Sequence, residues 1–345
     1  MPGIDQRTLR VLWTAFLFFL AAGILYLIRQ TLVVFVLALF LAHLLDPLVT
    51  WVAGRAPRRV DRTASLALVY LILLALLLVT VIPIGGRIGE EATGLATRLP
   101  QTIQADPLGH FPLPSWLEDV RPKLTQVLRD RLQDLDQQVL PLLTRAGTQI
   151  LSGLGNVLSV ILIPILSFFL LKDGDKLRST VINFFEGSAR TLVEEILTDL
   201  HTMLVNYLRA LVLLSIATFV AFSGFFTLIG VPYVILLAGI AAILELIPVA
   251  GPLASAVVII LVAAFSGFPH VLWLVIFLVI YRVFQDYVLN PYLLGSGVEM
   301  HPLLVLFGVL AGEQIAGIPG MFFSAPAMAA VRVIYVRTRE HRDAV

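Results

Sequence analysis

The sequence predicts an all-α polytopic membrane protein with about five or six full transmembrane helices, two broken or re-entrant helical hairpins, and amphipathic helical segments between the spans. Hydrophobic residues make up 59% of the 345 residues and charged residues only 14%, and the mean hydropathy is +0.94, unlike a soluble domain. Several apolar runs reach about 20 residues, the length that a helix needs to cross a bilayer. Two further apolar segments near the C-terminus are interrupted by proline and glycine.

Composition also argues against several function classes. A net charge of +1 provides no strong field for nucleic acid. The chain has no cysteine, so it has no disulfide and no thiolate metal site. It shows no nucleophile elbow, zinc-protease or phosphate-loop motif. We therefore expect no enzyme and no cofactor beyond coupling to H+ or Na+, and we expect lipid, a small polar solute or a monovalent cation, and copies of the chain itself as partners.

The N-terminal unit, residues 1–85, contains three predicted spans, at 11–28, 31–52 and 64–84. Each can cross about 30 Å at 1.5 Å per residue. The first span has the length of a signal peptide, but it continues into the second without a clear cleavage region, so we expect it to be retained.

Residues 86–148 form a predicted extracytoplasmic helical region. Charges return there, and a Pro-rich break at 106–116 separates two helical pieces. The second piece, 116–144, has apolar residues mostly three or four apart, which is typical of an amphipathic helix. Such a helix packs on its own protein or on a neighbouring copy more often than it binds lipid or ligand.

Residues 149–206 contain a fourth span, at 150–171, and a cytoplasmic amphipathic helix that begins at about residue 175. Between these two elements, Gly174 lies between two aspartates. This pattern predicts a simple turn or a helix-end cap.

The C-terminal unit, residues 207–345, is the predicted transport core. It contains spans at 208–230 and 270–289 and two broken segments, at 236–260 and 303–331. The arms of the first broken segment are too short for a comfortable crossing, so re-entrant hairpins fit better than spans. Lipid cannot satisfy backbone groups that a break sets free, so such breaks need protein or a water-filled cavity around them. Paired breaks of this kind indicate a transport site.

The candidate pathway residues lie on the two breaks and on the polar helix between them. A carboxylate near the bilayer centre costs about 2.5 to 3.5 kcal/mol on insertion scales, so Glu245 and Glu313 should be protonated, paired or in a wet cavity. Pro248 removes the helical hydrogen bond to the Leu244 carbonyl, and freed carbonyls of this kind can coordinate a cation or a polar solute. Plain structural kinks, and glutamates that only cap a break, are the alternative. The candidates are Glu245, Pro248, Gly251, Pro252, Arg282, Gln285, Asp286, Asn290, Glu313, Gln314, Gly317, Pro319 and Gly320.

The polar helix has its own pattern. Arg282, Gln285, Asp286 and Asn290 lie three or four residues apart, which predicts one polar stripe on an apolar helix. Arg282 and Asp286 can pair at i,i+4. A structural ion pair and a contact with the solute are both compatible with this spacing.

Positive charges orient the chain. The loop between the second and third spans holds four arginines, and the tail after Tyr335 holds three. Because such charges favour the cytoplasm, we place both of these segments and the N-terminus there. Residues 86–148 then lie outside. His43 and Asp46, near the end of the second span, are explained by an interfacial position.

Six motifs, in order along the chain, resemble the autoinducer-2 exporter family of bacterial permeases. They are SFFLLKDGDKLR at 167–178, NYLRA at 206–210, GVPYVILLAGIAAILELIPVAGP at 230–252, FQDYVLNPYLLG at 284–295, HPLLVLFGVLAG at 301–312 and GIPGMFFSAPAMA at 317–329. The resemblance implies a bacterial inner-membrane protein that moves small hydrophilic molecules. Some members are proposed to export a furanone-type signal and others to exchange sodium or lithium for protons. It also implies a homo-oligomer, with a pentamer as the expected form, and a mobile domain that acts as an elevator.

The resemblance carries over only to the residues of its motifs. The sequence departs from the family at Glu245, where the family often has asparagine or another polar residue. It departs again after Gln285, where Asp286 and Tyr287 replace a Glu-Asn or similar pair. The residues carried over are Lys172, Asp173, Gly174, Pro248, Gly251, Pro252, Asn290, Pro291, Gly317, Gly320 and Pro326.

Three functions follow as hypotheses. The leading one is a secondary transporter that exports a small hydrophilic organic solute, such as an autoinducer-2-like compound, by alternating access or elevator motion. The second is a Na+(Li+)/H+ antiporter that uses Glu245 and Glu313. The third is a non-transporting scaffold, in which residues 86–148 bind a partner and the breaks are only structural.

Overall fold

The computed structural model describes residues 6–55, 62–105, 157–294 and 301–344. Every regular element in these ranges is helical, with no strand among them. Five helices there are long and apolar enough to cross a membrane, which confirms the all-α polytopic membrane class. They cover Thr31–Arg55, Thr63–Arg98, Gly187–Ile229, Val271–Leu293 and Leu303–Asp343.

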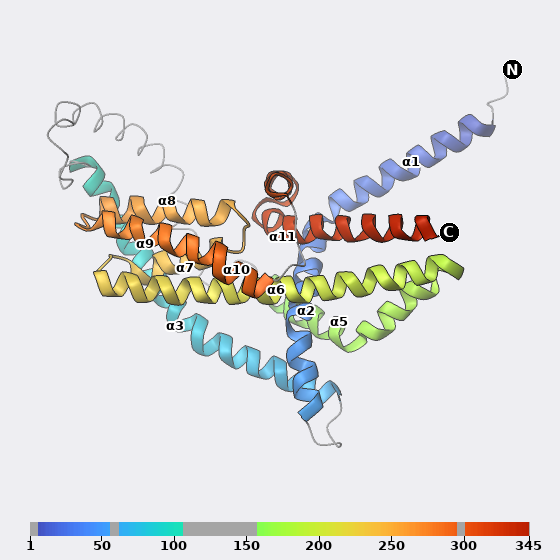
Figure 1. The fold of residues 1–345 in the computed structure, drawn as a ribbon, viewed down its shortest axis with the longest axis horizontal. Coiled ribbons are helices and arrows are strands. Elements are labelled where there is room, and N and C mark those ends of the chain that lie inside the picture. Colours follow the sequence, from blue (N-terminus) through green and yellow to red (C-terminus); the bar gives the residue numbers. More distant parts are fainter. Residues whose placement is uncertain (1–5, 56–61, 106–156, 295–300, 345) are drawn as a thin grey trace.

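The N-terminal part consists of α1 (Gln6–Leu27), α2 (Arg29–Arg55) and α3 (Arg62–Ala105). α1 extends away from the other helices (Figure 1). α3 is a continuous helix of 44 residues, so the predicted boundary after residue 85 falls inside one element. It ends where the Pro-rich break is predicted. The predicted helix at 116–144 lies outside the described residues.

The central part consists of α5 (Val157–Asn183) and α6 (Gly187–Ile229). The turn predicted at Gly174 is wrong, because α5 continues through it to Asn183. Local charges favour the helix, since Lys176 lies 3.4 Å from Asp173 one turn earlier. The predicted amphipathic helix is divided: residues 175–183 belong to α5, whereas the rest, from Gly187, is continuous with the fifth predicted span in α6.

The first broken segment is a helical hairpin made of α7 (Val234–Leu244) and α8 (Ala250–Phe265). It is followed by α9 (Val271–Phe284), the π-helical turn η2 (Gln285–Leu289) and α10 (Asn290–Leu294). In Figure 1, α6, α7, α8 and α9 form one bundle, with α6 against α7, α7 against α8, and α8 against α9.

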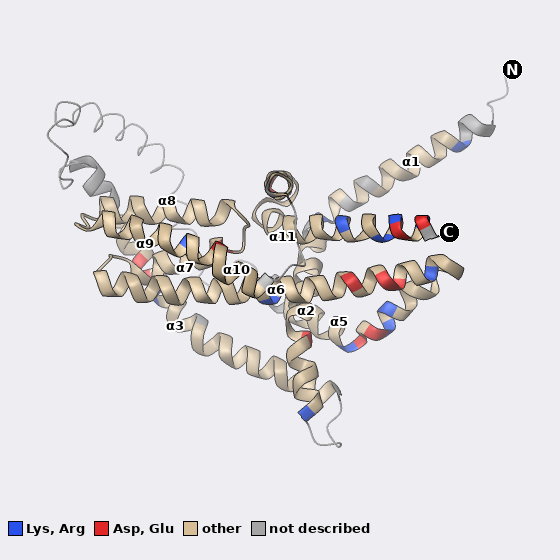
Figure 2. Ribbon diagram, in the orientation of Figure 1, with Lys and Arg blue, Asp and Glu red and all other residues tan. Residues whose placement is uncertain are grey.

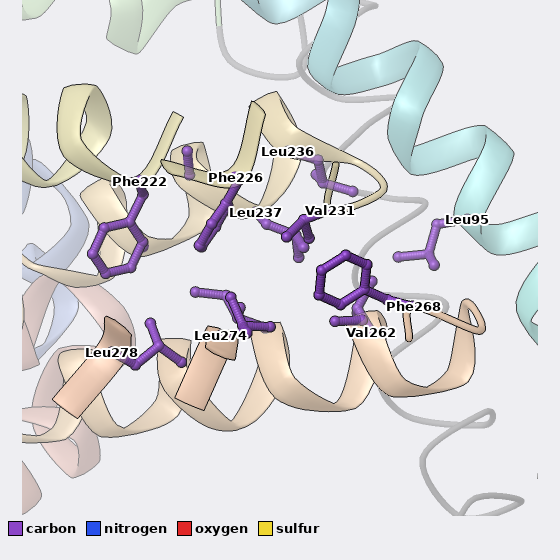
Figure 3. Close-up of a cluster of buried hydrophobic side chains, with 14 of the residues drawn as sticks. Leu95, Phe222, Phe226, Val231, Leu236, Leu237, Val262, Phe268, Leu274 and Leu278 are labelled. Atoms are coloured by element: carbon purple, nitrogen blue, oxygen red, sulfur yellow. The ribbon is translucent and has the colours of Figure 1, made fainter. Parts of the chain in front are cut away.

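Buried side chains from five helices hold this bundle together (Figure 3). α3 contributes Leu95, α6 contributes Phe226, α7 contributes Leu237, α8 contributes Ile259 and α9 contributes Leu274, and none is more than 1% exposed. Lipid tails are as apolar as these side chains, so close packing rather than removal from water holds helices together at membrane depth. The first hairpin is therefore fixed by shape against α3, α6 and α9.

The second broken segment is also a hairpin. Its helix, α11 (Pro302–Ala344), is interrupted where Gly317 takes a φ of 62°, a conformation that favours glycine. The two arms pack through small residues: a Cβ added to Gly320 would lie 1.8 Å from the Gly312 carbonyl oxygen, and one added to Gly308 would also touch the second arm. Re-entrance itself depends on the depth of each hairpin in the bilayer and stays a prediction.

Charged residues gather at one end of the molecule, where α5, α6 and α11 extend beyond their apolar parts (Figure 2). Arg337 of α11 connects two of these helices. Its Nε lies 2.6 Å from an Asp199 carboxylate oxygen, and its Nη1 lies 3.7 Å from one of Glu195. This ion-pair cluster ties the end of the second hairpin to the start of α6.

Candidate functional site

Glu245 directly follows α7 and is the centre of a buried polar network. Its side chain is only 8% exposed. The Gln285 amide nitrogen donates a hydrogen bond to one carboxylate oxygen, and the Thr218 hydroxyl donates to the other at 3.4 Å. The Tyr281 hydroxyl lies 3.0 Å from the Thr218 hydroxyl. These four residues, from α6, the first hairpin, α9 and η2, are called the Glu245 network below.

Gln285 reaches this network by ordinary α-helical spacing, because it lies four residues after Tyr281 and seven after Leu278, which are both buried along α9. The i,i+3 and i,i+4 spacing predicts that Gln285 shares one stripe with its polar neighbours, but the structure divides the stripe. Gln285 is 2% exposed, whereas Arg282 and Asp286 stay on the outer side and pair there at 2.9 Å, with Asn290 donating to Asp286 at 3.1 Å. The ion pair predicted from the spacing is confirmed. A π-turn changes the helical register by one residue, and such turns are frequent at functional sites.

The carboxylate of Glu245 has polar neighbours but no direct cation. Among the described residues, none with a positive charge lies within ion-pair distance of it, and Arg282 is engaged by Asp286. A buried charge without a partner of opposite sign is costly. The chemistry that this arrangement favours is therefore the binding of a proton, a monovalent cation or a polar group of a solute.

The tip of the first hairpin is closed by its own backbone. The Leu244 carbonyl, predicted to be free, accepts the N–H of Ile247 at 2.9 Å, and the Pro248 carbonyl accepts the N–H of Ala250 at 2.7 Å. The prediction that Pro248 leaves the Leu244 carbonyl unbonded is wrong, because a turn bond replaces the helical one. The second bond closes a tight γ-turn around Val249, which has φ 64° and ψ −57°, a rare and strained conformation for a β-branched residue.

Glycine is required where the second arm starts. A Cβ on Gly251 would lie 1.7 Å from the Leu244 carbonyl oxygen, so α8 can begin this close to the end of α7 only without a side chain. Pro252 lies in the first turn of α8, where backbone N–H groups have no helical partner, so a proline there costs no helical hydrogen bond. Glu245, Pro248, Gly251 and Pro252 thus lie on one compact tip.

The second break is not joined to the Glu245 network by any hydrogen bond or ion pair of the described residues. Glu313 and Gln314 have exposed side chains. Gly317, Pro319 and Gly320 form the turn of the second hairpin and the start of its second arm. This hairpin packs mainly on α6 and α2. The structure therefore places the two predicted glutamates in different surroundings, one buried and one exposed.

Three residues that contribute to the site are absent from the sequence prediction. Thr218 and Tyr281 are ordinary members of apolar helices, and no local signal distinguishes them. Glu91 of α3 accepts the backbone N–H of Leu236 at 2.8 Å, in the first turn of α7, where N–H groups have no helical partner. Glu91 thus caps the first hairpin from another helix, and only the tertiary structure shows that contact.

Comparison with known proteins matches nearly the whole chain. The family model for AI-2E family transporters matches residues 14–340. YueF of Bacillus subtilis, named as a candidate transport protein, is 25% identical over 343 residues, which are 95% of this chain and 92% of YueF. YrrI of the same organism is also named as a candidate transport protein. It is 26% identical over 345 residues, which are 95% of this chain and 93% of YrrI. PerM of Escherichia coli K12, named as a candidate permease, is 25% identical over 322 residues, 90% of this chain and 88% of PerM.

Proposed function

The chain belongs to the AI-2E transporter family, and from this premise we propose that it is a secondary transporter that exports a small hydrophilic organic solute by alternating access. Family and relatives establish a multi-pass membrane protein of the transporter class. The solute, the direction and the mechanism are our proposal. The observation that carries it is a buried carboxylate, Glu245, at the tip of a broken helical hairpin.

The geometry supports a binding role for this carboxylate. Its two hydrogen-bond donors, Gln285 and Thr218, come from elements outside the hairpin. A polar group of the solute, or a proton, can replace one of them, and the hairpin then loses part of its hold on α6 and η2. Binding at Glu245 would in this way be coupled to hairpin movement, which is what alternating access requires.

The family's name points to an autoinducer-2-like compound as the first solute to test. We further propose that the protein lies in a bacterial inner membrane with both termini in the cytoplasm, as the positive charges favour. A homo-oligomer, with a pentamer as the expected form, stays a prediction.

A Na+(Li+)/H+ antiporter is the second candidate. The observation that favours it is that Glu245 has no cation within ion-pair distance in the described part of the chain, so a proton and a sodium or lithium ion can compete for it. Glu313, the other glutamate of that hypothesis, is exposed and has no such environment. We therefore assign coupling to Glu245 alone.

One vesicle experiment separates these functions. Purified protein is reconstituted into sealed vesicles, and internal pH is followed with a dye while sodium, lithium or potassium is added. Glu245→Gln keeps the side-chain shape but removes the charge, and Glu313→Gln is the matched control. Cation-driven proton movement that only Glu245→Gln abolishes supports the antiporter.

If the internal pH does not change, the counterflow of radiolabelled polyols, sugars and an autoinducer-2-like compound is measured in the same vesicles. Solute flux that Glu245→Gln abolishes and Glu313→Gln retains supports the leading proposal. No flux of ion or solute in any vesicle would refute both and leave the non-transporting scaffold.

A further inference from the structure

Both hairpins contribute side chains to a cluster of aromatic and aliphatic residues around Tyr207 of α6. The Phe40 ring of α2 lies edge-on to Phe323 of the second hairpin, with ring centroids 4.7 Å apart, and at 5.7 Å from Phe322. Leu246, next to Glu245 in the first hairpin, packs on the same cluster. We call this cluster the hairpin seam; it consists of Phe40, Tyr207, Leu208, Leu211, Leu246, Phe322, Phe323 and Ala325.

The seam contains one buried polar atom that no other described residue satisfies. Tyr207 is 7% exposed, and its buried hydroxyl has no hydrogen-bond partner among the described residues. Buried tyrosine hydroxyls normally have a partner, and an unpaired one carries a desolvation penalty. Phenylalanine would fill the same space without that penalty. The hydroxyl thus favours any state in which an oxygen of water or of a solute can reach it.

The position of the seam gives this hydroxyl a role. Along α6, Tyr207 follows the charged segment that contains Asp199, and it precedes Thr218 of the Glu245 network by 11 residues, or about 16 Å of helix. Both hairpins contribute side chains to the seam. It therefore lies between the Glu245 network and the charged ends of α5, α6 and α11, and movement of a hairpin away from α2 and α6 would open it.

We propose that the hairpin seam is a gate between the Glu245 network and the charged end of the molecule, and that the Tyr207 hydroxyl binds an oxygen of water or solute when this gate opens. The proposal rests on the proposed function, since a gate serves transport. The unpaired hydroxyl raises the free energy of the closed gate relative to the open one. Removing it should therefore hold the gate closed for more of the time.

Cysteine accessibility tests the gate directly, because the chain has no cysteine of its own. Ala325→Cys places a thiol in the seam, and Ala263→Cys places one in the bundle core; the two alanines are 5% and 0% exposed. In proteoliposomes, a charged maleimide should label the seam thiol much faster than the core thiol. Adding Tyr207→Phe to Ala325→Cys should slow that labelling about five- to thirtyfold, which is the effect expected of one unsatisfied buried hydroxyl.

Three tyrosine-to-phenylalanine variants test whether the Tyr207 hydroxyl is unsatisfied, and the labelling separates the gate from a merely structural role. Tyr207→Phe should raise the unfolding temperature, Tyr281→Phe should lower it because a hydrogen bond is lost, and Tyr287→Phe, at a side chain 79% exposed, should leave it unchanged. A lower unfolding temperature for Tyr207→Phe, or a seam thiol labelled no faster than the core thiol, would overturn the proposal.

The source of the oxygen follows from the same labelling. Slower labelling of Ala325→Cys in the presence of ribose or erythritol identifies a solute in the open seam, and labelling that neither compound changes identifies water. Because the labelling assay needs no transported solute, its result can refute the gate without refuting the proposed function. Flux without labelling of the seam refutes the gate alone, whereas labelling without any flux refutes the transporter.

Discussion

Replacing Gly251 by alanine should disrupt the Glu245 network although residue 251 makes no polar contact with it. The new Cβ would lie 1.7 Å from the Leu244 carbonyl oxygen, whereas real Cβ contacts need at least 3.0 Å, so the start of α8 and the end of α7 must separate by about 1.3 Å. Glu245 is the next residue after Leu244. A shift of this size is enough to break its hydrogen bond from Gln285.

The expected loss of stability combines the cost of overpacking the hairpin tip with the cost of the broken hydrogen bond to Glu245. Overpacking costs about 1 to 3 kcal/mol, and losing a hydrogen bond to a buried charged group costs about 1.5 to 3 kcal/mol. Alanine recovers up to about 1 kcal/mol of helix propensity. We therefore expect the free energy of unfolding to fall by roughly 2 to 5 kcal/mol, with flux falling as well.

SDS titration of the purified protein, followed by tryptophan fluorescence, measures this change. Gly174→Ala in α5 is the matched control, because a Cβ there meets nothing within 4 Å and alanine in a helix interior should stabilise by about 0.5 to 1 kcal/mol. If Gly251→Ala unfolds and transports like the wild type, the close contact between the hairpin arms, and the dependence of the network on it, are refuted.

Three further changes test the surroundings of the first hairpin and the charged end. Glu91→Ala removes the cap of α7 and should lower stability by about 0.5 to 2 kcal/mol, measured in the same titration, whereas Glu90→Ala, at the exposed neighbour, should not; equal effects would contradict the cap. Val249→Gly removes a β-branched side chain from positive φ, so stability should rise by about 1 kcal/mol, and a loss instead would argue against the γ-turn. Arg337→Gln breaks the link between α11 and α6 and should lower the unfolding temperature slightly at low salt but not at 1 M salt, where exposed ion pairs are screened. Arg339→Gln is the control, because Arg339 pairs only at 3.9 Å, with Asp343 of its own helix, among the ion pairs of the described residues. A salt-independent loss at Arg337 would count against an electrostatic link.

Hydropathy and the placement of proline and glycine were sufficient to predict the fold class and both hairpins. These signals are local: an apolar run of about 20 residues has few stable alternatives to a helix in lipid, and a proline removes a helical bond wherever it stands. Local signals failed at Gly174, where turn-forming residues predicted a turn but α5 continues as a helix. They failed again at the Leu244 carbonyl, where a turn bond from Ile247 replaced the lost helical bond.

The candidate site was predicted in part. Spacing predicted the Arg282–Asp286 pair, since both residues belong to one helix. It also singled out Glu245 and Gln285 as candidates, because polar residues are costly at membrane depth. Spacing could not show that these two residues touch, because they belong to different elements, 40 residues apart, and their contact depends on how those elements pack. Nor could it separate the buried Glu245 from the exposed Glu313.

By itself, then, the sequence determined a helical membrane protein of this transporter family, with breaks at two defined places. Only the tertiary structure decided which side chains meet: Thr218 with Glu245, 27 residues apart, and Glu91 with the first turn of α7, 145 residues away. It also decided that both hairpins contribute side chains to the cluster around Tyr207. The physical reason is that helix formation and insertion depend on the composition of each segment. The contacts of a buried polar group depend instead on how separate helices pack, and no single segment encodes that packing.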